Sequence, residues 1–105
     1  MKTIKEQLLS NSYEYLRALP NYDKIRKELD ELETFMFKCA DKGMLLVYVI
    51  INPYPYEKNP SSNIKTGNFK THYVTDAILT LYCEMNQLYL KQYEDSDDFE
   101  IRWVK

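Results

Sequence analysis

The chain has 105 residues, of which 45% are hydrophobic, so it is long enough for one domain with its own core. Its formal net charge of -2 excludes a protein whose whole surface binds nucleic acid, because such a surface must be basic. The two glycines are too few for the glycine-rich phosphate loops of nucleotide-binding enzymes.

The first predicted helix covers residues 4–18. Thr3 and Glu6 match a capping box, in which the side chain of each residue accepts a hydrogen bond from the backbone N–H of the other. Apolar residues then recur at helical spacing. Pro20 ends the helix, because a residue before proline is disfavoured in the helical region.

A second helix begins with Asn21 or Asp23 as its N-cap and ends at Lys42 and Gly43, a cation followed by a residue suited to a left-handed cap. Its apolar positions alternate at gaps of three and four, which predicts a buried stripe. They are Tyr22, Ile25, Leu29, Leu32, Met36 and Cys39. Opposite charges four residues apart predict a solvated outer face. These pairs are Asp23/Lys27, Lys24/Glu28, Arg26/Asp30 and Lys27/Glu31.

Residues 44–51 form an uninterrupted apolar run, which predicts a central strand with both faces covered. A long loop follows at residues 52–68 and contains three prolines. Beyond it, residues 68–74 favour a further strand that pairs with the first as a hairpin. That assignment competes with a helix running straight out of the loop, capped by Thr71 rather than by Thr75.

The third predicted helix has an apolar stripe wide enough to need cover on two sides. Its stripe is Val74, Ile78, Leu81, Met85 and Leu88, flanked by Leu79, Tyr82, Tyr89, Leu90 and Tyr93. At the end of the chain, Phe99, Ile101 and Trp103 alternate with Glu100 and Arg102, which predicts a half-buried edge strand. The expected fold is therefore a single α+β domain over residues 1–105, with two N-terminal helices, a long third helix and a sheet of two or three strands, depending on whether residues 68–74 form a strand.

Residues suited to catalysis or metal binding are sparse. His72 is the one histidine, and Cys39 and Cys83 fall within helical patterns without the short spacings of a zinc site. Both cysteines are expected to be buried and reduced. We therefore expect a protein that is not an enzyme and that has no metal and no cofactor.

The abundance of tyrosine favours binding of another macromolecule, since tyrosine joins a large apolar ring to a polar group. The expected partner is a host protein or a protein–nucleic acid complex. We expect aromatic contacts from the loop and the third helix, and acidic residues before the last strand to steer a basic partner. The predicted contact residues are Tyr54, Tyr56, Tyr89, Tyr93, Asp95, Asp97 and Asp98.

Two alternatives compete with this interpretation, and a third is compatible with either binding hypothesis. The loop and the residues after it could bind single-stranded nucleic acid, with Lys58, Lys65 and Lys70 neutralising phosphates and Phe69 stacking on a base. The loop could instead be slack between two parts of the core. A second copy of the chain could also cover the stripe of the second helix or the wide apolar face of the third.

In type, the sequence resembles the small acidic α+β accessory proteins of phages and mobile elements, which are rich in tyrosine and lysine and include inhibitors of host defence such as anti-CRISPR proteins. No motif carries this resemblance. It implies an inhibitor or regulator of a host protein. The first residues lack a signal-peptide pattern, and the longest apolar run is far below the roughly 20 residues of a membrane helix, so we expect a cytoplasmic protein without a membrane anchor.

Overall fold

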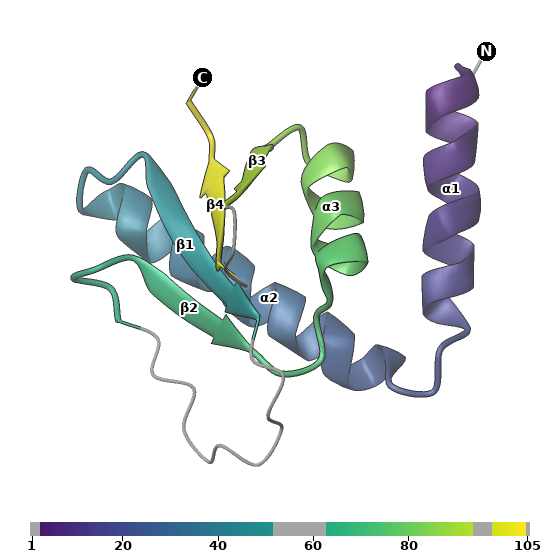
Figure 1. The fold of residues 1–105 in the computed structure, drawn as a ribbon, viewed down its shortest axis with the longest axis horizontal. Coiled ribbons are helices and arrows are strands. Elements are labelled where there is room, and N and C mark those ends of the chain that lie inside the picture. Colours follow the sequence, from purple (N-terminus) through teal and green to yellow (C-terminus); the bar gives the residue numbers. More distant parts are fainter. Residues whose placement is uncertain (1–2, 52–62, 94–97, 105) are drawn as a thin grey trace.

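The computed structural model describes residues 3–51, 63–93 and 98–104. This part of the chain has an α+β fold with three helices and a four-stranded sheet (Figure 1). The elements are α1 (Ile4–Arg17), α2 (Tyr22–Asp41), β1 (Leu46–Ile51), β2 (Asn68–Thr71), α3 (Asp76–Met85), β3 (Tyr89–Gln92) and β4 (Asp98–Arg102). In the described ranges, no helix is long and apolar enough to cross a membrane.

The strand order is β2-β1-β4-β3, so β1 is central, as its apolar sequence predicts. β1 pairs with β2 in parallel and with β4 antiparallel, and β3 pairs with β4 antiparallel. The expected hairpin of β1 and β2 is therefore wrong, because parallel strands require a connection that returns to the starting end of the sheet. Residues 52–67 make that connection.

The predicted helix boundaries hold for α1 and α2. Thr3 Oγ1 accepts a hydrogen bond from the Glu6 backbone N–H at 3.1 Å, and Gly43 ends α2 with a φ of 86°. For α3, the Thr75 side chain is the cap, with Oγ1 accepting from the Ile78 N–H at 3.4 Å. Thr71 instead ends β2.

The long third helix is a wrong prediction at its C-terminal end. α3 stops at Met85, and Gln87 takes a positive φ of 58°, which turns the chain into β3. Tyr89 and Leu90 therefore lie in a strand. Because β3 pairs with the free edge of β4, the final strand is an inner strand of the sheet and not an edge strand.

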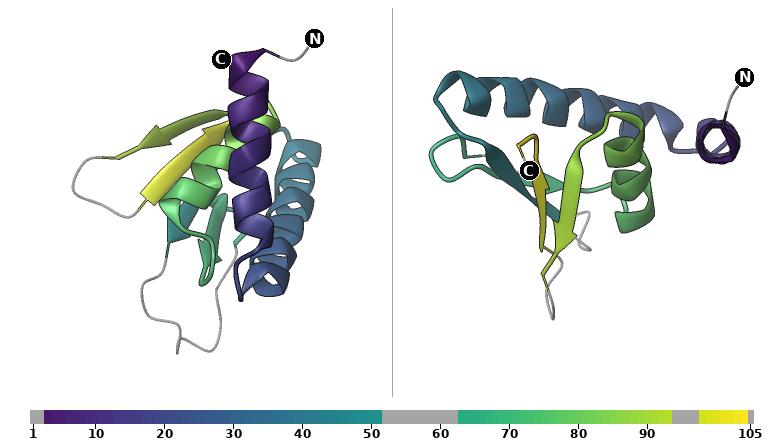
Figure 2. Two further views of the ribbon diagram at one scale, coloured as in Figure 1. Left: turned by 90° about the vertical axis from the view of Figure 1, so that its right-hand side faces the viewer. Right: turned by 90° about the horizontal axis from the view of Figure 1, so that it is seen from above.

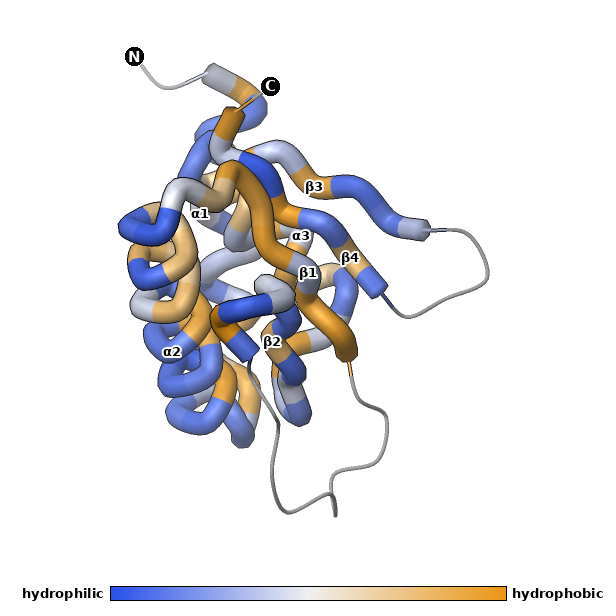
Figure 3. Tube along the Cα trace, turned by 90° about the vertical axis from the view of Figure 1, so that its left-hand side faces the viewer, coloured by the Kyte–Doolittle hydropathy of each residue, from blue (hydrophilic) through white to orange (hydrophobic). Residues whose placement is uncertain are grey.

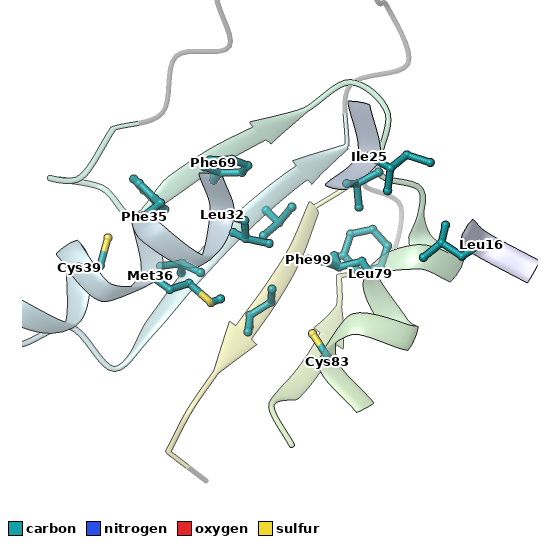
Figure 4. Close-up of a cluster of buried hydrophobic side chains, with 14 residues drawn as sticks. Leu16, Ile25, Leu32, Phe35, Met36, Cys39, Phe69, Leu79, Cys83 and Phe99 are labelled. Atoms are coloured by element: carbon teal, nitrogen blue, oxygen red, sulfur yellow. The ribbon is translucent and has the colours of Figure 1, made fainter. Parts of the chain in front are cut away.

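The core lies between the sheet and the helices (Figure 4), and α2 and α3 both pack on the same face of the sheet (Figure 2). The core joins inward-facing residues of the central strands to the buried sides of the two helices. The fully buried hydrophobic residues include Leu32, Cys39, Val47, Val49, Leu79 and Ile101. Figure 3 shows the same division, with β1 hydrophobic along its length and polar residues recurring along α2.

Glu28 ties α2 to the connection between β2 and α3. Its carboxylate accepts backbone N–H groups from His72 and Tyr73, each at 2.6 Å, and from Val74 at 3.0 Å. The expected pairing of Glu28 with Lys24 is thus replaced, and the Lys24 ammonium lies 5.0 Å from the Tyr73 ring centroid. Arg26 and Asp30 do form the predicted pair, at 3.2 Å.

Candidate partner-binding surface

The second face of the sheet, which we call the outer sheet face, carries no helix in the described part of the chain (Figure 2). Val47, Val49, Phe99 and Ile101 point to the core, so alternation places their neighbours on the outer side. The strand register sets those neighbours in rows across the sheet. The residues are Leu46, Tyr48, Ile50, Asn68, Lys70, Tyr89, Lys91, Tyr93, Asp98, Glu100 and Arg102.

Glu100 is the centre of this face and is only 3% exposed. It lies between Tyr48 on β1 and Lys91 on β3 in the strand register. Its carboxylate accepts a hydrogen bond from Arg102 Nε and another from the Tyr93 hydroxyl at 2.7 Å. These bonds lower the pKa of Glu100, with the Arg102 guanidinium as the largest cause. The Glu100 carboxylate is therefore a buried charge at the centre of this face, and it is held in place by two hydrogen bonds.

The same network orients two tyrosine rings. The Tyr93 hydroxyl donates to Glu100, and the pKa of Tyr93 rises to about 12 because ionisation would lose this hydrogen bond and place a second negative charge beside the carboxylate. The Tyr48 and Tyr93 ring centroids lie 6.4 Å apart, tilted by 43°. The Lys91 ammonium lies 5.3 Å from the Tyr93 centroid. Tyr89 is 47% exposed and pairs with Arg102, so its ring lies in the row next to that of Glu100.

Three of the predicted partner contacts come together on this face: Tyr89, Tyr93 and Asp98. The other four, Tyr54, Tyr56, Asp95 and Asp97, lie outside the described residues. The described residues nearest to these four in the sequence lie at one end of the sheet: Ile51, Tyr93 and Asp98. Ile50 pairs with Asp98, and the Tyr93 N–H donates to the Asp98 carbonyl at 3.2 Å.

The three described residues among those predicted for nucleic acid do not form one surface. Phe69 is only 5% exposed and packs on Phe35, with ring centroids 5.3 Å apart, so it is a core residue and not available to stack on a base. Lys65 is exposed in the turn before β2, whereas Lys70 lies on the outer sheet face beside Ile50. Lys58 lies outside the described residues.

Cys39 and Cys83 are buried free thiols, as the sequence predicts. Burial raises the pKa of Cys39 and raises that of Cys83 to about 12, so neither is a ready nucleophile. His72 follows β2, and its Nδ1 is buried without a hydrogen-bond partner.

The sequence analysis missed Tyr48 and Glu100 as surface-forming residues. Tyr48 sits in an apolar run that is compatible with a strand buried on both faces. Glu100 sits at a position expected to face solvent, and its burial depends on Tyr93, which pattern analysis placed in a helix. A weak signal was nevertheless present, because Leu88 and Leu90 alternate with Tyr89 and Lys91 in the manner of a strand.

No known protein family, curated protein or solved structure compared with the chain matched it. The function is therefore argued from the chemistry of the surface.

Proposed function

We propose that the protein is a non-enzymatic, cytoplasmic binding protein that occupies a surface of another macromolecule through its outer sheet face. It acts as an inhibitor or regulator of a host protein, of the kind that phages and mobile elements encode against host defence. The observation that supports this proposal best is the array of Tyr48, Tyr89 and Tyr93 around the buried Glu100.

Such an array suits recognition of a protein surface. Tyrosine loses little side-chain entropy on binding, and rings already fixed by neighbours lose less still. Glu100 fixes Tyr93 by a hydrogen bond, and Tyr48 lies against Tyr93. The charged residues of this face have both signs: Lys70, Lys91 and Arg102 are basic, and Asp98 and Glu100 are acidic. A partner surface of mixed charge therefore fits better than a phosphate backbone.

The test is capture of the partner by the tagged protein from a bacterial lysate, with and without nuclease and at low and moderate salt. Once mass spectrometry identifies the captured protein, its affinity is measured for the wild type, Tyr89→Ala and Tyr93→Phe. We expect Tyr89→Ala to weaken binding by about tenfold or more, as truncation of an interface tyrosine does. Tyr93→Phe keeps the ring and isolates the hydroxyl.

Phe37→Ala is the matched control, because Phe37 is an exposed aromatic residue on α2, 66% exposed and away from the sheet. Unchanged affinity in Tyr89→Ala, or an equal loss in Phe37→Ala, would overturn the assignment of the outer sheet face. Recovery of nucleic acid alone, lost as salt rises, would support the lysine alternative and overturn the proposed function, since phosphate contacts release counterions.

A further inference from the structure

Helix α1 leaves most of its apolar side uncovered. Only Leu16 is buried, whereas Ile4, Leu8 and Tyr15 are 80%, 61% and 74% exposed. At about 100° per residue these three side chains lie within roughly 40° of one another around the helix, so they form one ridge. The ridge runs for most of the helix, which spans about 21 Å.

A groove of about 580 Å³ runs beside this ridge, between α1 and α3. Its large apolar residues are Leu9, Leu16, Leu19, Ile78 and Leu81, and the ridge residue Tyr15 also lines its edge. Ser12, Ala77 and Thr80 also line it, and their small side chains leave room for a helix to approach closely. Figure 2 shows the two helices side by side, with α1 set apart from the sheet.

The charges around this surface are paired within the chain. Lys5 and Glu84 join the two helices at 2.7 Å, and Glu14 pairs with Arg17 at 3.5 Å on the far side of α1. None of the ridge residues is charged. A strongly acidic or basic partner would therefore find no complementary group on the ridge.

We propose that this surface binds a second copy of the chain. A ridge beside a groove is self-complementary under a two-fold axis, because the ridge of each copy can enter the groove of the other. The two α1 helices would run antiparallel, with Ile4 of one copy beside Tyr15 of the second copy. In this arrangement Lys5 and Glu14 lie on opposite sides of the ridge, so the pairing places no like charges together.

The interface is small. It is formed by the 14 residues of α1 and one side of α3, whereas a standard interface buries roughly 800 Å² per partner. The dimer is therefore weak and dissociates on dilution. This inference does not depend on the proposed function, since the outer sheet face lies on the four strands and stays open in the dimer.

Sedimentation velocity over a concentration series tests the dimer. We expect the wild-type protein to shift from monomer to dimer as concentration rises, and Leu8→Glu to raise the dissociation constant at least tenfold. Leu8 is mostly exposed, so the variant should fold, and circular dichroism checks this. Phe37→Glu is the matched control, because it places the same charge at an equally exposed apolar site outside the ridge. A wild-type protein that stays monomeric at millimolar concentration overturns the inference.

Crosslinking tests the location of the interface. Ser12 lines the groove, whereas Ser10 lies roughly 200° around the same helix. We expect a short bismaleimide to link Ser12→Cys into dimers but not Ser10→Cys, while the buried Cys39 and Cys83 stay unreacted. Equal crosslinking of both variants, or a dimer that Leu8→Glu leaves intact, places the contact elsewhere and overturns the proposal. So does binding of a different protein at this groove in place of the second copy.

Discussion

Helices α1 and α2 follow one another in the sequence and have similar patterns, yet the fold uses them differently. α2 buries Ile25, Leu32, Phe35, Met36 and Cys39 against the sheet. α1 buries Leu16 alone and contacts α3 at the margin of the domain. Periodicity therefore predicts that a helix forms and which side is apolar, but the identity of the element that covers that side depends on the tertiary fold.

The comparison also separates two kinds of exposed surface. The outer sheet face buries the Glu100 charge, and hydrogen bonds to it fix the side chains of Tyr93 and Arg102. The α1 ridge exposes apolar side chains that no neighbour in the described part of the chain fixes. The first surface is preorganised, and the second gains stability only when something covers it.

The largest expected effect separates the two helices directly. Leu32→Ala removes a fully buried side chain of α2 and should lower the free energy of unfolding by about 2–5 kcal/mol. Leu16→Ala should cost only about 1 kcal/mol, because α1 can detach while the rest of the fold persists. Chemical denaturation measures both values, and hydrogen exchange should show lost protection confined to α1 in Leu16→Ala. Equal destabilisation by the two changes would show that α1 belongs to the cooperative core.

A smaller loss is expected when α2 is released from the connection before α3. Glu28→Ala leaves three backbone N–H groups without their acceptor, which should cost about 2–3 kcal/mol. Glu31→Ala on the same helix is the control and should change stability by less than about 0.5 kcal/mol, because Glu31 is exposed. Thermal unfolding of the two variants distinguishes an anchor from a general effect of charge on α2. Similar melting temperatures would contradict the anchoring role.

Local signals predicted much of the fold. The Thr3 cap, the glycine stop at Gly43 and the central position of β1 each depend on residues close in sequence, and each is confirmed. The expected cover on both faces of β1 is not found, because its buried residues alternate with half-buried ones. The errors at Leu88, Leu90 and Tyr93 arise because short apolar segments fit a helix and a strand equally well. The positive φ of Gln87 decides between them, and glutamine gives no warning of it.

The candidate surface was less accessible to prediction than the fold. Parallel pairing of β1 with β2 and the central position of β4 are long-range choices that no local pattern specifies. Once β4 lies between β1 and β3, Tyr48, Tyr93 and Glu100 meet. The expected tyrosine contacts at Tyr89 and Tyr93 therefore came from composition, and the carboxylate that holds Tyr93 could be recognised only from the sheet order.

The smallest expected effect tests whether the outer sheet face is held by charge. Because the folded pKa of Glu100 lies below its ordinary value of 4.5, its ionised form stabilises the fold above that pH, and this contribution is lost as pH falls through the lower folded pKa. Glu100→Gln should therefore cost about 2 kcal/mol near pH 7, and the difference from wild type should shrink below about pH 4.5. Urea denaturation across this pH range measures it.

The same variant carries an independent readout in Tyr93. Loss of the carboxylate should bring the pKa of Tyr93 down from about 12 toward the ordinary value of 10, while Tyr82 keeps its pKa of about 12, which is raised by burial. Ring-labelled tyrosine followed by NMR during an alkaline titration resolves the two residues. If the difference in the free energy of unfolding does not change with pH and the pKa of Tyr93 stays at about 12, Glu100 holds this face by packing alone. The preorganised surface would then differ from the α1 ridge in shape and not in electrostatics.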